Sequence, residues 1–380
     1  MLKSFQIDNF RLFQHLEVRN LSRVNLIVGK NNAGKSSFLE ALKLYASNSD
    51  PFVLLDLIQS RQETWSSEVQ PRFQTFLANP VRHLFFDHKL PKIGDKGIYI
   101  GEISSSMNLS INIGAYQEKN DEEGSIKKIR ISDIEDEDFS SIEAWLIIEE
   151  NERTRRLFRL DRSIEEIRRN SRLSYEKTAF ESRYRLQTVA TENMPNQKIA
   201  NLWDLTSLTD LESDVYSALK LIDSRVTGVA FVEDIINRDS GSSSRLSRSN
   251  RIPLVKLKGI DEPLPLKSMG DGMTRLFHII VSLVNAKDGL LLIDEFENGL
   301  HWGIQPKVWD IIFQLSEKLN VQVFATTHSR DCITSFDSAW NKYPEFGAFF
   351  RLDRKNDMIK ATEYTLETLT DSLETDVEVR

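Results

Sequence analysis

A glycine-rich segment near the start of the chain carries residues that could hold phosphate groups. Residues 29–37 read GKNNAGKSS, in which Gly29, Gly34, Lys35 and Ser36 match the phosphate-loop pattern in full. Glycines let backbone N–H groups turn inward around phosphates, the lysine reaches the β- and γ-phosphates, and the serine hydroxyl binds Mg²⁺. The predicted contacts with ATP are Gly29, Asn31, Asn32, Ala33, Gly34, Lys35, Ser36 and Ser37.

The residues on either side supply the context that a phosphate loop requires. Val24–Val28 predicts a buried strand that enters the loop, and residues 36–45 place apolar side chains at helical spacing. That helix would point the positive end of its dipole at the phosphates. A glycine-rich turn that matches by chance is the alternative, and the flanking strand and helix disfavour it.

Two acids follow another apolar run far along the chain. Residues 289–295, GLLLIDE, predict a central strand of a covered parallel sheet, with Asp294 and Glu295 at its carboxyl end. Asp294 is the predicted Mg²⁺ ligand beside Ser36, and Glu295 is the predicted base that orients and deprotonates water. Taken alone, the pattern equally fits a strand that ends in an acidic turn. The phosphate loop favours the catalytic interpretation.

Two further segments flank these acids in the sequence. Ser268, Gly270 and Gly272 precede an amphipathic helix, and such a helix start can bind an anion. On spacing alone, an ordinary helix cap is the better interpretation. Residues 324–329, FATTHS, predict a strand that ends at His328. Alone, this would be a satisfied strand-end histidine; one strand after GLLLIDE, it could contact the γ-phosphate.

The chain divides into two lobes and an insertion. We predict an N-terminal lobe at 1–95, an insertion with strands and charged helices at 96–250, and a C-terminal lobe at 251–380. Within the insertion, apolar residues over 205–222 form a stripe at helical spacing.

Charge is unevenly distributed within the insertion. Residues 121–150 are mostly acidic, whereas residues 151–185 are rich in arginine. The basic run could be a nucleic-acid groove, whose binding would fall steeply with salt. We favour the alternative, a solvated helix face paired with the acidic segment, because Glu165 and Glu166 interrupt the basic run.

Length and composition exclude several classes of protein. The chain has 380 residues, enough for a large core, and a net charge of −8, which argues against coating nucleic acid through overall charge. The single cysteine, Cys332, cannot form an internal disulfide, which fits a reducing compartment. The start lacks the apolar segment of a signal peptide, and polar residues interrupt the longest apolar stretch, 276–293. We therefore expect a cytoplasmic protein without membrane contact.

These segments, in this order, resemble the ABC-type ATPase superfamily, in the soluble branch with RecF, the structural-maintenance-of-chromosomes heads and the OLD-family nucleases. The resemblance covers residues 1–45 and 264–335. It implies an α/β fold: an ABC-ATPase head whose mixed or parallel sheet carries the phosphate loop, an antiparallel β subdomain and a helical, charged insertion. It also implies the cofactors ATP and Mg²⁺.

The resemblance further implies a homodimer or higher oligomer that closes around ATP. In such dimers Ser268, Gly270 and Gly272 of one subunit would act on ATP bound at Lys35 of the other. Residues 297–301, ENGLH, would form the D-loop, in which residues 298–301 could line the dimer seam.

Other roles follow from the same resemblance. Glu295 would be the catalytic base and His328 the switch histidine, and Arg11 in NFRLF matches a basic position near the nucleotide. The glutamine of the Q-loop has no evident match; Gln74 and residues 82–86 are the candidates.

Within that branch, three segments are similar to OLD-type ATPases of bacterial phage-defence operons: PLKSMGDGMTRLF, LLLIDEFENGLH and VQVFATTHSRDCI. The signature reads SMGDG, whereas transporter subunits have LSGGQ. Members carry a fused Toprim nuclease or work with a separately encoded nuclease or toxin. About fifty residues follow Ser329, fewer than a Toprim domain needs. The resemblance therefore implies a regulatory ATPase with a separate effector, a Toprim or HNH nuclease being the candidates.

Three other functions compete with this one. A RecF-like DNA-repair clamp would bind nucleic acid directly. A transporter energy subunit is disfavoured by the signature wording and the long insertion. A kinase or GTPase with one self-sufficient site would leave residues 268–272 and 324–329 without a role.

Overall fold

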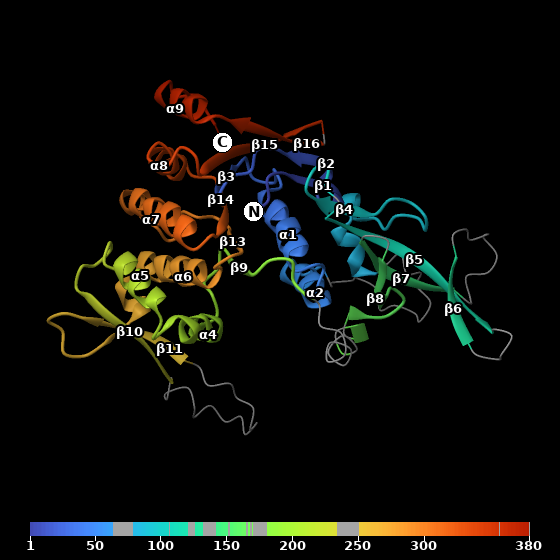
Figure 1. The fold of residues 1–380 in the computed structure, drawn as a ribbon, viewed down its shortest axis with the longest axis horizontal. Coiled ribbons are helices and arrows are strands. Elements are labelled where there is room, and N and C mark those ends of the chain that lie inside the picture. Colours follow the sequence, from blue (N-terminus) through green and yellow to red (C-terminus); the bar gives the residue numbers. More distant parts are fainter. Residues whose placement is uncertain are drawn as a thin grey trace.

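The computed structural model describes residues 1–63, 79–105, 107–120, 126–131, 142–150, 153–164, 166–167, 169, 181–233, 251–356 and 358–379. Figure 1 shows helices gathered on both sides of a central sheet, with a second sheet beyond α1. The helices are α1 (Lys35–Ala46), α2 (Pro51–Ser60), α4 (Asn196–Thr206), α5 (Asp210–Leu219), α6 (Asp271–Asn285), α7 (Gln305–Lys318), α8 (Arg330–Trp340) and α9 (Leu366–Glu374).

The central sheet carries the phosphate loop and is mainly parallel. In spatial order its strands are β16 (Met358–Tyr364), β15 (Gly347–Lys355), β3 (Val24–Val28), β14 (Gln322–Thr327), β13 (Leu290–Ile293) and β9 (Leu186–Val189). β3 pairs in parallel with β14 and β15, and β13 pairs in parallel with β14 and β9, whereas β16 is antiparallel to β15. The carboxyl ends of β3, β14 and β13 therefore meet at one edge.

Each face of this sheet is covered by its own hydrophobic core. Leu26 of β3 packs in one core with residues of α6, α7 and α8, whereas the next residue, Ile27, packs in the other with α1. Successive side chains of a strand point to opposite faces, so a strand covered on both sides is mainly apolar. β3 and β13 are buried along their whole length, and Asn25, the polar residue of β3, donates to the carbonyl oxygens of Ser22 and Val323.

The second sheet is antiparallel and packs against α1. Its strands are β1 (Phe5–Phe10), β2 (Phe13–Val18), β4 (Ile98–Gly101), β5 (Asn108–Asn120), β6 (Ile126–Ile131), β7 (Ile142–Glu150) and β8 (Arg153–Arg159). They run in the order β2-β1-β4-β5-β7-β8, with β6 on β5. Phe5 makes edge-to-face contacts with Phe38 and Tyr45 of α1, each at 5.7 Å between ring centroids. The predicted fold class, an α/β ABC-ATPase head with an antiparallel β subdomain, is confirmed.

The first part of the arginine-rich run is a strand, so the predicted helix is wrong there. β8 completes an antiparallel hairpin with β7, which carries acids across from it. Arg155 lies 3.6 Å from Glu150, and Arg159 lies 2.5 Å from Glu143. The predicted pairing of this run with the preceding acids is confirmed for β8.

The apolar stripe over 205–222 is divided between two helices. Thr209 accepts a hydrogen bond from the amide of Leu211 at 3.3 Å, and the Glu212 carboxylate accepts one from the amide of Leu208 at 2.8 Å. This reciprocal cap starts α5 as a new helix. It leaves Leu208 almost fully exposed with a φ of 63°.

A small antiparallel sheet leads into α6. It contains β10 (Val226–Glu233), β11 (Arg251–Leu257) and β12 (Leu264–Pro265), and a 3₁₀ turn at Leu266–Met269 connects β12 to α6. Within the described ranges, every helix is too short or too polar to cross a membrane.

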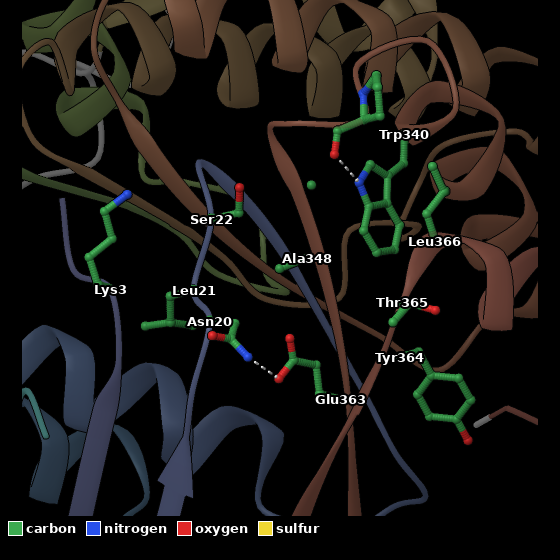
Figure 2. A pocket seen from close by; sticks show the side chains of 12 residues that line it. Lys3, Asn20, Leu21, Ser22, Trp340, Ala348, Glu363, Tyr364, Thr365 and Leu366 are labelled. Carbon is green, nitrogen blue, oxygen red and sulfur yellow. Dashed lines mark hydrogen bonds between the residues drawn. The ribbon is translucent and has the colours of Figure 1, made fainter.

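A pocket of about 560 Å³ lies at the edge of the central sheet opposite the phosphate loop (Figure 2). Leu21 and Ser22 precede β3 and Gly347 opens β15, so the pocket faces the amino ends of these strands. Asn20 donates to Glu363 at 2.9 Å on its wall. The pocket is therefore separate from the site that follows the carboxyl end of β3.

Candidate active site

The phosphate loop joins the carboxyl end of β3 to the first residue of α1. Gly34 is the N-cap of α1 with a φ of 94°, and a Cβ there would lie 2.8 Å from the ring of Phe13. A Cβ on Gly29 would lie 2.5 Å from the carbonyl oxygen of Leu352. Both positions therefore require glycine. Because Gly34 has no side chain with which to cap the helix, the first turn of α1 can offer its amides to an anion.

Lys35 lies against this loop. Its Nζ donates to the carbonyl oxygen of Gly29 at 2.6 Å and to that of Lys30 at 3.3 Å. Partial burial lowers the pKa of Lys35, and the carboxylates that follow β13 oppose that shift. The ammonium is thus held beside the loop that is predicted to bind phosphates.

The other predicted phosphate contacts belong to the same loop and helix start. Asn31 and Asn32 are exposed, and Asn32 has a φ of 63°, whereas Ala33 and Ser37 are buried. The Ser37 hydroxyl accepts a hydrogen bond from Arg61 at 3.3 Å. The motif did not predict Arg61, because this residue follows α2 and carries no local pattern of its own.

Ser36 meets Asp294 at the edge of the central sheet. The Ser36 hydroxyl donates to Oδ2 of Asp294 at 3.0 Å, although 258 residues separate the two in sequence. Thr326 of β14 donates to Oδ1 of Asp294 at 2.5 Å and accepts from the amide of Glu295 at 3.0 Å. One threonine hydroxyl therefore orients both predicted acids.

The oxygen atoms of Ser36 and Asp294 suit Mg²⁺. This ion prefers hard oxygen ligands and, in nucleotide sites, takes one or two from the protein and the rest from phosphates and water. Among the described residues, no group of three or more His, Cys, Asp or Glu could hold a metal. A cation held by Ser36 and Asp294 would take its remaining ligands from phosphate and water oxygens.

Glu295 and His328 lie near each other. Glu295 has a φ of 47°, and its side chain is 38% exposed. His328 follows β14, and its Nδ1 lies 3.9 Å from Oε1 of Glu295 and 3.1 Å from Oε1 of Glu297. The motif did not predict the contact with Glu297, which depends on how two loops approach each other.

Ser268, Gly270 and Gly272 lie where the 3₁₀ turn passes into α6. Gly270 is the N-cap of α6 with a φ of 93°, and this helix also has no side-chain cap. A Cβ on Gly272 would lie 3.2 Å from the carbonyl oxygen of Gly299 in the predicted D-loop. α6 and α1 pack on opposite faces of the central sheet (Figure 1), so one chain presents these two helix starts on different sides.

Residues 24–331 match the sequence family described as "AAA domain, putative AbiEii toxin, Type IV TA system". The match extends from β3, before the phosphate loop, through His328. The chain belongs to this AAA family.

Relatives of this AAA domain include proteins with and without a named activity. The whole chain is 26% identical over 361 residues to the "ATP/GTP phosphatase" of Helicobacter pylori, and the alignment covers 89% of this chain and 88% of that protein. It is 48% identical over 54 residues to the uncharacterized protein MJECL10 of Methanocaldococcus jannaschii, covering 14% of this chain and 25% of that protein.

Solved structures similar to this AAA domain include heads of SMC proteins. The SMC head domain from Thermotoga maritima has a TM-score of 0.44 and 11% identity, with 96% of this chain and 98% of that chain covered. The SmcHead bound to the C-winged helix domain of ScpA has a TM-score of 0.49 and 12% identity, with the same coverage.

In this AAA domain Arg11 is a structural residue, contrary to the predicted contact with nucleotide. The arginine is 3% exposed and forms ion pairs with Glu40 of α1, at 3.0 Å, and with Glu63. It also donates to the carbonyl oxygens of Leu57 and His83, at 3.1 and 3.0 Å. The guanidinium is therefore enclosed by protein and joins α1 to the end of α2.

Of the two candidates for the Q-loop, the structure describes one. Gln74 lies outside the described residues. Residues 82–86 lie largely in a 3₁₀ turn, and Phe85 forms a bridge with Phe10 at the end of β1. This segment of the AAA domain therefore packs against the antiparallel sheet.

Arg275 of α6 binds the backbone behind both acids. Its Nη2 donates to the carbonyl oxygens of Asp294 and Glu295, at 2.7 and 2.9 Å, and its Nη1 donates to that of Ala190. Burial lowers the pKa of Arg275, and the nearby carboxylates, Asp294 foremost, oppose that shift. The sequence signal for this role is a lone arginine among apolar residues at the start of a predicted helix.

We predict that Arg275→Met destabilises the protein, because three carbonyl oxygens lose a charged donor. The expected loss in the free energy of unfolding is about 2–4 kcal/mol, measured by denaturant unfolding. Arg225→Met is the matched control, since Arg225 is exposed and pairs with Asp223 two residues away. A loss no larger than in the control would show that the carbonyl contacts contribute little.

Proposed function

We propose that this AAA domain binds ATP with Mg²⁺ and hydrolyses it to ADP and phosphate. The hydrogen bond from Ser36 to Asp294 carries this proposal, because it joins the phosphate loop to the acids that follow β13. Lys35, Glu295 and His328 lie on three segments that reach the same edge of the sheet. This arrangement supplies the cation, base and switch residue that the reaction requires.

Each residue has a defined task in the proposed reaction. Lys35 and the loop amides hold the β- and γ-phosphates. Ser36 and Asp294 would hold Mg²⁺, which would offset negative charge on the phosphate oxygens. Glu295 orients a water molecule and takes its proton as the water oxygen bonds to the γ-phosphorus. The bond from that phosphorus to the bridging oxygen breaks, and ADP leaves. His328 contacts the γ-phosphate.

The Helicobacter pylori relative supports hydrolysis as the activity. It is named an ATP/GTP phosphatase, and the alignment covers 89% of this chain. A phosphate loop recognises phosphates rather than bases. Both ATP and GTP therefore belong in the activity assay, with ATP as the expected substrate.

We further propose that two copies of the chain close around ATP. The support is the placement of two uncapped helix starts, α1 and α6, on opposite faces of one sheet. In a homodimer, Ser268, Gly270 and Gly272 of one copy would complete the site formed around Lys35 of the other.

We propose that closure of this dimer regulates a separately encoded effector, a nuclease or toxin, in bacterial phage defence. The family description, which includes a toxin and a Type IV TA system, supports a role of this kind. The arginines of β8 that pair with acids disfavour the alternative of a DNA clamp, because neutralised arginines are less available to nucleic-acid phosphates.

Two substitutions should separate ATP binding from hydrolysis. Lys35→Ala should abolish ATP binding, whereas Glu295→Gln should bind ATP normally and hydrolyse it roughly 10²–10⁴-fold more slowly, because the base is lost. Calorimetric titration and phosphate release measure the two properties. Lys30→Ala is the matched control in the loop and should retain both. Hydrolysis by Glu295→Gln at the normal rate would show that Glu295 is not the base.

Mixing two inactive variants tests whether the signature acts across a dimer. Ser268→Arg and Lys35→Ala proteins should each be inactive, and their equal mixture should recover about a quarter of the wild-type ATPase activity, since half of random dimers carry one intact site of two. A mixture of Lys35→Ala and Glu295→Gln should recover nothing. Absence of recovery in the first mixture, with heterodimers demonstrated by pull-down, would rule out the trans arrangement.

The proposed effector can be captured with the hydrolysis-deficient protein. Tagged Glu295→Gln should hold the closed dimer and retain a stoichiometric protein partner from its native cells after nuclease treatment, identified by mass spectrometry. Lys35→Ala is the control that cannot close. Recovery of DNA without such a partner would favour the RecF-like clamp instead.

A further inference from the structure

The carboxylate of Glu297 binds His328 at two points. Oε1 of Glu297 accepts a hydrogen bond from the backbone amide of His328 at 3.0 Å, and the same oxygen lies 3.1 Å from Nδ1 of the imidazole. One oxygen atom thus holds both the backbone and the ring of the residue. Two contacts to one residue fix the direction of the side chain as well as the position of the loop.

The position of the carboxylate bears on which ring nitrogen carries hydrogen. A carboxylate oxygen beside an imidazole nitrogen attracts a hydrogen atom on that nitrogen, so the 3.1 Å separation favours hydrogen on Nδ1 of His328. The 3.9 Å separation between Nδ1 and Oε1 of Glu295 is too long for a hydrogen bond. The imidazole is therefore engaged by Glu297 and leaves the carboxylate of Glu295 free, while Nε2 is the nitrogen left for another partner.

The burial of Glu297 argues against a role in folding stability. Its side chain is 12% exposed, and Oε2 is buried without a hydrogen-bond partner among the described residues. An unpaired buried carboxylate oxygen destabilises the folded state. A side chain placed at such a cost is better explained by the geometry of the site than by packing of the loop.

We propose that Glu297 is a positioning residue that holds His328 in the Nδ1–H tautomer, aims Nε2 toward the nucleotide, and keeps the ring away from Glu295. This inference rests on the proposed ATPase function of the same site. The arrangement follows the general behaviour of carboxylate–imidazole pairs, in which the acid sets the tautomer and orientation of the ring.

The first test measures the tautomer directly and does not require activity. The protein contains six histidines, and the ¹⁵N-histidine spectrum of His328→Gln assigns the signal of His328 by subtraction. At pH 8, where an ordinary imidazole is neutral, His328 should be the Nδ1–H tautomer in the wild type and a mixture in Glu297→Ala. Glu297→Gln should restore the Nδ1–H form, because both donors reach a single oxygen that the amide retains. An unchanged tautomer in Glu297→Ala would overturn the proposal.

The second test asks whether Glu297 acts through His328. Glu297→Ala should lower kcat roughly 10- to 100-fold with little change in KM for ATP, and Glu297→Gln should restore most of the loss. In a His328→Ala background, Glu297→Ala should cause no further loss. An equal loss in both backgrounds would contradict a positioning role.

Control experiments distinguish failure of the proposed role of Glu297 from failure of the proposed ATPase function. Glu262→Ala, at an exposed glutamate in the turn before β12, should leave kcat unchanged, and thermal unfolding should show that Glu297→Ala is at least as stable as the wild type. A wild-type protein without ATPase activity would refute the proposed function, and the tautomer test would still decide the role of Glu297.

Discussion

The site depends on the parallel register of three strands. β14 pairs with β3 on one side and with β13 on the other, which sets Thr327 beside Val28 and Ala325 beside Ile293. The phosphate loop, the paired acids and the histidine segment therefore leave the sheet at one edge, within hydrogen-bond reach of each other. Short turns after each strand are then sufficient to bring their side chains together.

The elements of this site were predictable where burial imposes a pattern on neighbouring residues. β3 matches the predicted strand Val24–Val28, and α1 extends one residue beyond each end of the predicted helix, because strands covered on both faces and helices covered on one leave a local signal. Contacts between segments leave no such signal. The roles of Arg275 and Arg61, and the contact of Glu297 with His328, were missed for this reason.

Two wrong predictions also show that sequence patterns do not encode contacts between distant segments. Arg11 matched a position in a family motif, but its surroundings, which motifs do not encode, bury the guanidinium against Glu40. The helix predicted over the arginine run failed because the acids of β7 make β8 the better partner as a strand. Contacts between segments distant in the sequence, rather than composition, decided both cases.

Three carboxylates lie near two cations at this edge of the sheet. Asp294, Glu295 and Glu297 follow one short strand, and their charges act on Lys35 and Arg275. Both cations lie partly or fully out of solvent, where their attraction to the carboxylates is weakly screened. A polyphosphate brought to this edge adds negative charge, which is the physical reason for a divalent cation between Ser36 and Asp294.

The position of β3 in the sheet also affects folding of the chain during its synthesis on the ribosome. Its neighbours on both sides, β14 and β15, lie some 300 residues later in the chain. β3, which is apolar except for Asn25, is therefore synthesised long before these partners, when exposed strand edges promote aggregation. The antiparallel sheet can assemble earlier and pack against α1. This early core can bury one face of β3 before its partner strands are made. At that stage the phosphate loop still lacks Asp294, which is synthesised 258 residues after Ser36.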